Sequence, residues 1–337
     1  MARGATRSVG LEIDTGIIRA VEAAGTANSP KLISMAHIPL PEGAVEEGMV
    51  TDPVKVGEAL RDLWNSGTLK HRKVLLGVAN QGVLVRYSTI PKVPKEKMDN
   101  VIRFHAQELL PIPLDSVVMD YMVIGEREDE GSSLLEILLV AARRDMLNGF
   151  ISALNAAKLE AADVDVSTLA MMRILPLVAD RRTVAMVNVS NGLSNILVSA
   201  SRVPRLARLV SVKINDLAEI LGCPLTEVLL RAGHGGRTAQ DKYFGWLRSL
   251  IAETRSSLNY YQNQNHASEI EAIILNGRGA RLSGIATMMQ DALELPVKIV
   301  NPFEGFSNAN QKTGGSGLEA VDFAISAGLA RRGLEGS

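Results

Sequence analysis

Two stretches of the sequence repeat one pattern, and this repeat limits the possible folds more than any other feature. They are VGLEIDTGIIRAVEA, from Val9, and VAMVNVSNGLSNILVS, from Val184. Each has an apolar run with a polar residue near its end, a tight polar turn and a second apolar run, which predicts a β-hairpin. Glu12 and Asn188 hold matching places 176 positions apart. We therefore expect an internal duplication whose halves face each other, with ligand chemistry at the cleft between them.

Strands alternate with helices along the rest of the chain, which predicts a mixed α/β fold. Further strands are expected at 32–38, 73–78 and 271–275, and helices after Pro53 and at 216–221, 225–232, 247–261 and 319–331. Between the two hairpins, from Val85 to Ser167, the order changes to strand, helix, two strands, helix and strand. This order predicts a separate α/β module, with Pro94 in the first turn of its first helix and a second helix at 145–159. We expect the hydrophilic stretches 126–133 and 307–317 to be solvated loops.

Composition excludes several classes of function. The 337 residues suggest about two domains. With 36 basic and 37 acidic residues, the chain lacks the excess positive charge that binding to nucleic acid needs. The single cysteine, Cys223, excludes an internal disulfide and a zinc site built on several thiolates, so we expect a reducing compartment. No secretory leader, membrane span, catalytic motif or metal site is predicted.

A further candidate site follows the strand expected at 271–275. Gly277 and Gly279 flank Arg278 at a junction that leads into a helix. Glycines let the backbone turn sharply and approach a ligand closely, and a helix N-terminus favours anionic groups. The alternative is a plain turn between a strand and a helix.

The ordered set of hairpin, inserted module, second hairpin, long helix and NGRGA turn resembles the actin-like ATPase superfamily. More narrowly, it is similar to the FtsA-like PilM proteins of type IV pilus assembly. The resemblance extends from Val9 to Gly333 and includes PLPEGAVEEGMVTDP, TIPKVPKEKMDNVIRFHAQELLPIPLDSVVMDY, LVAARRDMLNGFISAL and LELPVKIVNPF. It implies duplicated ribonuclease-H-like lobes with an inserted SHS2-like module. The first lobe would comprise 1–84 and 168–182, the module 85–167 and the second lobe 183–337.

The resemblance also implies a cleft that can hold ATP and Mg²⁺. The candidate residues are Glu12, Asp14, Thr15, Gly16, Asn188, Ser190, Asn191, Glu253, Gly277, Arg278 and Gly279. Glu253 is expected near a ribose, although Ser256, one turn later, supplies no cation. Arg278 is expected either to meet a phosphate or to cover an empty cleft.

Two positions depart from the family pattern. Asp14 stands where the family has glycine, and a carboxylate about 4 Å from a phosphate oxygen costs about 4 kcal/mol at an effective dielectric of 20. Asn188 stands where the family has the acidic residue that helps to hold magnesium and the attacking water, and Ser190 replaces a glycine. An amide supplies neither a base nor negative charge to the metal. We therefore expect no catalytic residue. Hydrolysis, binding without turnover and an empty or repurposed cleft remain alternatives.

The partner implied by the resemblance is a PilN-like bitopic inner-membrane protein, bound through its cytosolic N-terminal peptide. We expect residues 85–94, VRYSTIPKVP, to line the groove for it. The predicted function is a cytosolic scaffold of the pilus assembly platform, peripheral to the inner membrane through this partner. Other platform or motor proteins and a second copy of the chain are further possible partners. The alternative is an enzyme of the same fold, an ATPase or a small-molecule kinase.

Overall fold

The computed structural model describes residues 6–129, 132–175, 182–264, 267–308 and 319–335. The chain forms two compact units, one of residues 1–80 and 151–337 and the other of Gln81–Phe150. The tip of the expected loop at 126–133 and residues 309–317 of the expected loop at 307–317 lie outside the described residues.

The first sheet of the larger unit has the strand order β10-β6-β1-β2-β3. Its strands are β1 (Arg7–Asp14), β2 (Ile17–Thr26), β3 (Ser29–Pro39), β6 (Lys73–Val78) and β10 (Glu160–Val166). The first predicted hairpin is β1 and β2, which pair antiparallel, and β6 runs parallel to β1. The short strands β4 (Val45–Glu46) and β5 (Met49–Val50) follow β3, and α1 (Pro53–Asn65) starts at the expected proline, capped by the Asp52 carboxylate.

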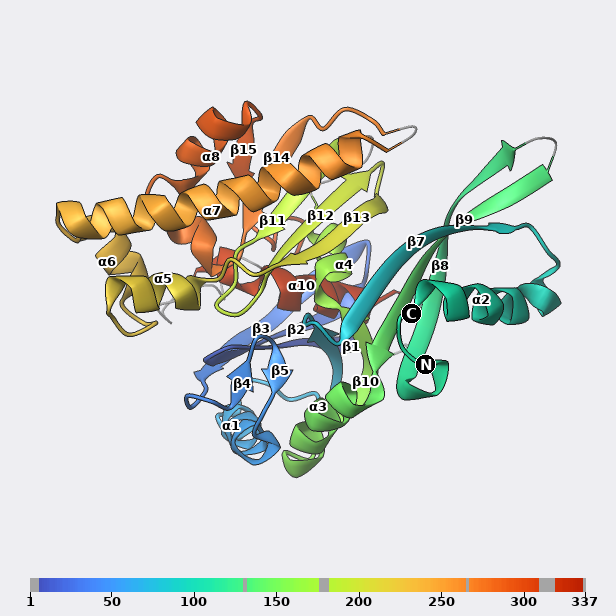
Figure 1. The fold of residues 1–337 in the computed structure, drawn as a ribbon. Helices are drawn as coiled ribbons and strands as arrows, with labels where there is room; N and C mark the ends of the chain where they lie inside the picture. Colours follow the sequence, from blue (N-terminus) through green and yellow to red (C-terminus); the bar gives the residue numbers. More distant parts are fainter. Residues whose placement is uncertain (1–5, 130–131, 176–181, 265–266, 309–318, 336–337) are drawn as a thin grey trace. The chain divides into compact units, whose positions relative to one another are not determined.

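The C-terminal helix α10 (Ala324–Arg332) lies against β1 and β2 (Figure 1). It follows the short 3₁₀ helix η5 (Ala320–Phe323), so the helix expected at 319–331 consists of two pieces. The contact depends on Gly10 in β1, because a Cβ there would lie 2.1 Å from the carbonyl oxygen of Ser326. Helix α10 is thus packed directly against the first hairpin.

The second sheet repeats the plan of the first, with the strand order β13-β12-β11-β14-β15. Its strands are β11 (Thr183–Asn188), β12 (Ser194–Ala200), β13 (Val203–Val210), β14 (Ala272–Asn276) and β15 (Val297–Ile299). The second predicted hairpin is β11 and β12, and β14 runs parallel to β11 as β6 does to β1. The repeat seen in the sequence therefore extends to whole sheets. The structure adds β13 and β15 to the strands predicted from the sequence.

Helices complete the second half of the larger unit. They are α5 (Ile214–Leu221), α6 (Val228–His234), α7 (Arg237–Gln262) and α8 (Ile285–Leu293), with α4 (Ser167–Ala170) and the 3₁₀ helix η2 (Met171–Ile174) before the second hairpin. Figure 1 shows α7 extending along the second sheet, and its buried Trp246, Leu250 and Leu258 belong to one core with Val187 and Ile196 of the hairpin. The NGRGA turn leads into a four-residue 3₁₀ helix, η4 (Arg278–Arg281), and not directly into an α-helix.

The smaller unit is a three-stranded sheet, β7-β9-β8, with helix α2 on one face (Figure 1). Its elements are β7 (Val83–Pro91), α2 (Lys95–Leu109), the 3₁₀ helix η1 (Leu114–Ser116), β8 (Val117–Asp129) and β9 (Ser132–Arg143), followed by α3 (Arg144–Ala156). Pro94 is the N-cap of α2, one position before the expected first turn. The backbone of 126–129 is a strand, because Glu126 pairs with Leu135 and Glu128 with Ser133.

The compact smaller unit, residues 81–150, contains fewer residues than the module expected at 85–167. Strand β10, which that range includes, pairs with β6 in the first sheet from Glu160 to Val166. Strand β10 belongs to the larger unit because its backbone N–H and C=O groups form hydrogen bonds with the parallel strand β6. The smaller unit therefore ends before β10. Within the described residues, no helix is both long and apolar enough to cross a bilayer.

Candidate functional site

The tips of the two hairpins meet through the carboxylate of Asp14. Its Oδ2 accepts a hydrogen bond from the backbone N–H of Asn191 at 3.2 Å, and its Oδ1 accepts one from the N–H of Gly192 at 3.0 Å. The side-chain amide of Asn191 donates in turn to the carbonyl oxygen of Thr15 at 3.0 Å. Asp14 is 7% exposed. The expected cleft residues of the two hairpins therefore lie in direct contact.

Arg19 on β2 lies between two carboxylates of β1. Its Nη1 is 3.1 Å from Oε1 of Glu12 and 3.5 Å from Oδ2 of Asp14. All three side chains are buried, and Oε2 of Glu12 has no hydrogen-bond partner among the described residues. Burial raises the pKa of Glu12 to about 7, against the opposing effect of the Arg19 charge, and the charge of Asp14 adds to the rise. Glu12 therefore titrates near neutral pH inside the fold.

This titration makes stability depend on pH. Below a pH of about 4.5 Glu12 is protonated in both states, whereas between 4.5 and about 7 only the folded protein keeps the proton. The free energy of unfolding should therefore fall as pH rises through this window, by on the order of 3 kcal/mol for this residue. Urea unfolding at pH 5 and pH 8 measures the change.

Substitution isolates the contribution of Glu12. Glu12→Gln should show a smaller loss of stability between pH 5 and pH 8 than the wild type. Glu253→Gln, which changes a partly exposed carboxylate on α7, is the control. It should lose as much stability between pH 5 and pH 8 as the wild type does. Equal pH dependence in Glu12→Gln and the wild type would show that Glu12 is ionised in the folded protein throughout the range.

Both functional groups of the Asn188 amide have partners. Its Nδ2 donates to Oδ1 of Asn276 at 2.6 Å, and its Oδ1 accepts a hydrogen bond from the hydroxyl of Ser190. Gly277 has a φ of +79°, and a Cβ there would lie 2.8 Å from Nδ2 of Asn188. A Cβ on Gly279 would lie 2.3 Å from Cγ1 of Val189. The glycines of the NGRGA turn are therefore required by close packing against the second hairpin.

Arg278 extends from this turn toward both hairpin tips. It is 8% exposed, and its guanidinium donates to the carbonyl oxygen of Leu225 at 2.8 Å and to Oδ1 of Asn191 at 3.3 Å. Within the part of the chain that the structure describes, its Nε has no hydrogen-bond partner. Burial and, next, the positive charge of Arg19 lower its pKa. Of the two roles expected for Arg278, these contacts favour covering the cleft with protein atoms.

A cavity of about 1230 Å³ adjoins the hairpin tips. Thr15, Gly16 and Arg278 line it, together with residues of β3, β4 and the loop between them, and residues of α5 and the loop that follows it. Its charged lining also includes Lys213 and the carboxylates Glu42, Glu46, Glu47 and Glu219. Lys213 forms an ion pair with Glu47 at 2.8 Å and so links the segment before α5 to the β4–β5 turn. The charges of this lining are mainly negative, which disfavours a triphosphate.

The structure brings ten of the eleven candidate residues together and places Glu253 elsewhere. Glu253 is on α7, its carboxylate pairs with Arg208 at 3.2 Å, and both side chains are more than 40% exposed. It does not line the cavity. Sequence reasoning missed Arg19, Gly192 and Asn276. Hairpin register could have identified Arg19, because it is directly opposite Glu12 on the neighbouring strand.

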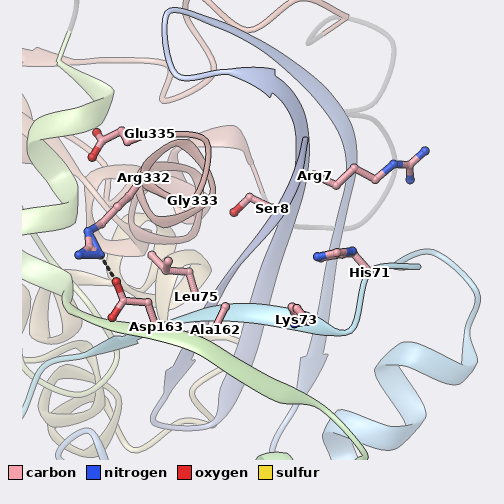
Figure 2. Close-up of a pocket in the computed structure, with 10 residues that line it drawn as sticks. All are labelled: Arg7, Ser8, His71, Lys73, Leu75, Ala162, Asp163, Arg332, Gly333 and Glu335. Atoms are coloured by element: carbon pink, nitrogen blue, oxygen red, sulfur yellow. Dashed lines mark hydrogen bonds and ion pairs between the residues drawn. The ribbon is translucent and has the colours of Figure 1, made fainter. Parts of the chain in front are cut away.

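A second hollow, of about 390 Å³, lies beside the ends of β1, β6 and α10 (Figure 2). Arg7, Lys73 and Arg332 line it, and each forms an ion pair: with Glu22 at 2.9 Å, Glu160 at 3.2 Å and Asp163 at 2.8 Å. Figure 2 shows the contact between Arg332 and Asp163 across this hollow. Because these cations have carboxylate partners, the hollow is a weak candidate for an anion site.

Comparison with known structures defines the class of fold. The chain resembles the ethanolamine utilization protein EutJ from Carboxydothermus hydrogenoformans, with 12% identity, coverage of 97% of this chain and 89% of the other, and a TM-score of 0.55. It also resembles MreB5 of Spiroplasma citri bound to AMPPNP, with 9% identity, 97% and 95% coverage, and a TM-score of 0.54. The fold is therefore that of the actin-like ATPases, as predicted.

The family follows from two further findings. The model of the family described as type IV pilus assembly protein PilM matches residues 10–202 and 244–334. A structure of a PilM–PilN type IV pilus biogenesis complex matches with 25% identity, 97% coverage of this chain, 98% coverage of the other and a TM-score of 0.85. The chain belongs to the PilM family of type IV pilus assembly proteins.

The actin-like neighbours make nucleotide and Mg²⁺ plausible ligands, so their fit to these side chains matters. The backbone donors of Asn191 and Gly192 already bind the Asp14 carboxylate, and the amide of Asn188 has partners at both ends. Among the described residues, no group of three or more His, Cys, Asp or Glu side chains is arranged to hold a metal ion. The side chains as they lie do not fit a phosphate group at the hairpin tips.

Proposed function

We propose that the protein is a scaffold of the inner-membrane platform of type IV pilus assembly. In this role it binds the cytosolic N-terminal tail of a PilN-like membrane protein and is held at the cytoplasmic face of the membrane by that partner. The observation that carries the proposal is the match to a PilM–PilN complex over nearly the full length of both chains. Other platform or motor proteins and a second copy of the chain are further partners in this proposal.

A degenerate nucleotide cleft is part of the proposed function. An ATPase or kinase of this fold needs space and donors for phosphate and a carboxylate for magnesium. Here Asp14 occupies backbone donors at the tips, and Asn188 offers an amide with both ends engaged. These contacts support a scaffold over the enzyme alternative.

The smaller unit offers a surface for the partner's tail. Its helix α2 packs on the face of the sheet that carries Leu84, Met119 and Tyr121. Since side chains alternate along a strand, Val85 of β7 and Val118 and Met122 of β8 lie on the opposite face. Val118 is 46% and Met122 44% exposed, and β8 is an edge strand. An apolar peptide strand can add to such an edge, whereas Val85, in the segment expected to line a groove, is on β7 at the other edge of the sheet.

Binding of the tail tests this function. A fluorescent peptide of a PilN-like N-terminus should bind the full chain with a dissociation constant on the order of micromolar, because it must order on binding. Met122→Asp should weaken binding at least about tenfold, since it places a charge in an apolar contact. ATP should not be required. Fluorescence anisotropy measures the affinity of the wild type, the effect of Met122→Asp and the effect of ATP.

The control is Phe104→Asp, which changes an apolar side chain that is 62% exposed on α2. It should leave the affinity unchanged. Weakening by Phe104→Asp with no effect of Met122→Asp would place the tail on α2 instead. Absence of binding to the wild type would refute the proposed function. Point variants are preferable to deletion of 85–167, because that deletion removes β10 from the first sheet.

A further inference from the structure

The Asp14 carboxylate is bound as a free anion would be. Its two oxygens accept hydrogen bonds from the backbone N–H groups of Thr15 at 2.8 Å, Asn191 at 3.2 Å and Gly192 at 3.0 Å. The guanidinium of Arg19 lies 3.5 Å from Oδ2. Successive backbone N–H groups at a turn, together with a guanidinium, are a donor set that binds phosphates and other anions in proteins.

Two of the donors, the N–H groups of Asn191 and Gly192, come from the other hairpin. Asp14 ends β1 in the first sheet, whereas Asn191 and Gly192 form the turn between β11 and β12 in the second. The turn approaches so closely that a Cβ on Gly192 would lie 2.8 Å from Oγ1 of Thr15 and 3.0 Å from Oδ1 of Asp14. Glycine at this position therefore allows the N–H to reach the carboxylate.

Burial strengthens the hydrogen bonds by which Asp14 holds the two hairpins together. Asp14 is 7% exposed and Asn191 is fully buried, so water competes little for these hydrogen bonds. If the carboxylate were removed, two buried N–H groups and Arg19 would lose an anionic partner. A buried donor without a partner costs free energy, and a small anion that enters the same space would recover it.

We propose that the carboxylate of Asp14 is a built-in anion that occupies the place of a phosphate group and holds the two hairpins together without a bound ligand. This inference deepens the proposed function, on which it rests for the view that the cleft is degenerate. The ligand class that the donors would accept in place of Asp14 is a phosphate or pyrophosphate anion.

Hydrogen exchange on the full chain tests the proposal. In Asp14→Ala the amides of Asn191 and Gly192 should exchange at least about tenfold faster than in the wild type. Sodium pyrophosphate at millimolar concentration should restore slow exchange in Asp14→Ala and change nothing in the wild type. Asp241→Ala, at an exposed position of α7, is the control and should match the wild type.

A second variant covers the case in which Asp14→Ala does not fold. Asp14→Asn keeps the shape but loses the charge, so exchange should be intermediate, and pyrophosphate should not slow it because the amide still fills the space. The inference is wrong if pyrophosphate slows exchange in the wild type, if it fails to slow exchange in Asp14→Ala, or if the variants exchange like the wild type. Tail binding is measured separately, so loss of tail binding with slow amide exchange would refute the proposed function and leave this inference standing.

Discussion

Replacing Asp14 with glycine and Asn188 with aspartate should raise the affinity for ATP with Mg²⁺ by tens to about a thousandfold. At about 4 Å and an effective dielectric of 20, a carboxylate disfavours a phosphate oxygen by about 4 kcal/mol, which corresponds to about a thousandfold in affinity. Asp14→Gly removes this charge and also frees the backbone N–H groups of Asn191 and Gly192. Asn188→Asp supplies the negative charge that a magnesium ion needs.

The surroundings of position 188 can accept the new carboxylate. Asn188 now donates to Oδ1 of Asn276, and the buried Nδ2 of Asn276 has no hydrogen-bond partner in the described segments. Rotation of the Asn276 amide by half a turn would present that Nδ2 to the introduced carboxylate as a donor. The substitution therefore replaces one hydrogen bond with another and should not disrupt the second hairpin.

Isothermal titration of ATP with magnesium measures the gain, and the single variants separate its sources. Asn188→Asp alone should raise the affinity for ATP only slightly, because the Asp14 carboxylate still accepts hydrogen bonds from the backbone N–H groups. Asp14→Gly alone should give part of the increase in ATP affinity that the double variant shows. If the double variant folds and binds no better than the wild type, the cleft is closed by more than these two side chains.

Much of the fold could be predicted from the sequence because its signals are local. The strand predicted at 73–78 is β6, and the second predicted hairpin is β11 and β12. Alternating apolar residues and turn residues determine such elements over a few positions. Recognition of the family added the actin-like arrangement, which periodicity alone does not specify.

The remaining features depend on long-range packing. Asp14 was expected to repel a ligand, but its contacts with Asn191 and Gly192 come from residues more than 170 positions away. Glu253 was placed by its position along a helix, whereas the rotation of α7 on its sheet brings it to Arg208. The partners of β10 also depend on tertiary pairing, and a strand pattern does not reveal which sheet a strand will join.

The glycine beneath the C-terminal helix should be the position where one added methyl group costs most stability. A Cβ on Gly10 would lie 2.1 Å from the carbonyl oxygen of Ser326 and 2.4 Å from the amide nitrogen of Ala330. Both atoms belong to the backbone of α10, so rotation of a side chain cannot relieve the clash and the helix must move off the sheet. Overpacking of a core costs 1–3 kcal/mol and occasionally more. For Gly10→Ala we expect a loss of about 3 kcal/mol or more in the free energy of unfolding.

The matched control is the same substitution in an open part of a helix. Around Gly245 in α7 the nearest atom to an added Cβ is a guanidinium nitrogen of Arg248, 4.0 Å away. Gly245→Ala should therefore raise stability by up to about 1 kcal/mol, because alanine favours the helix more than glycine does. Urea unfolding of the three proteins measures both changes. If Gly10→Ala were as stable as the wild type, α10 would not rest on β1 at the described distance. A loss of stability in Gly10→Ala and a gain in Gly245→Ala would show that the last helix packs tightly on the first hairpin.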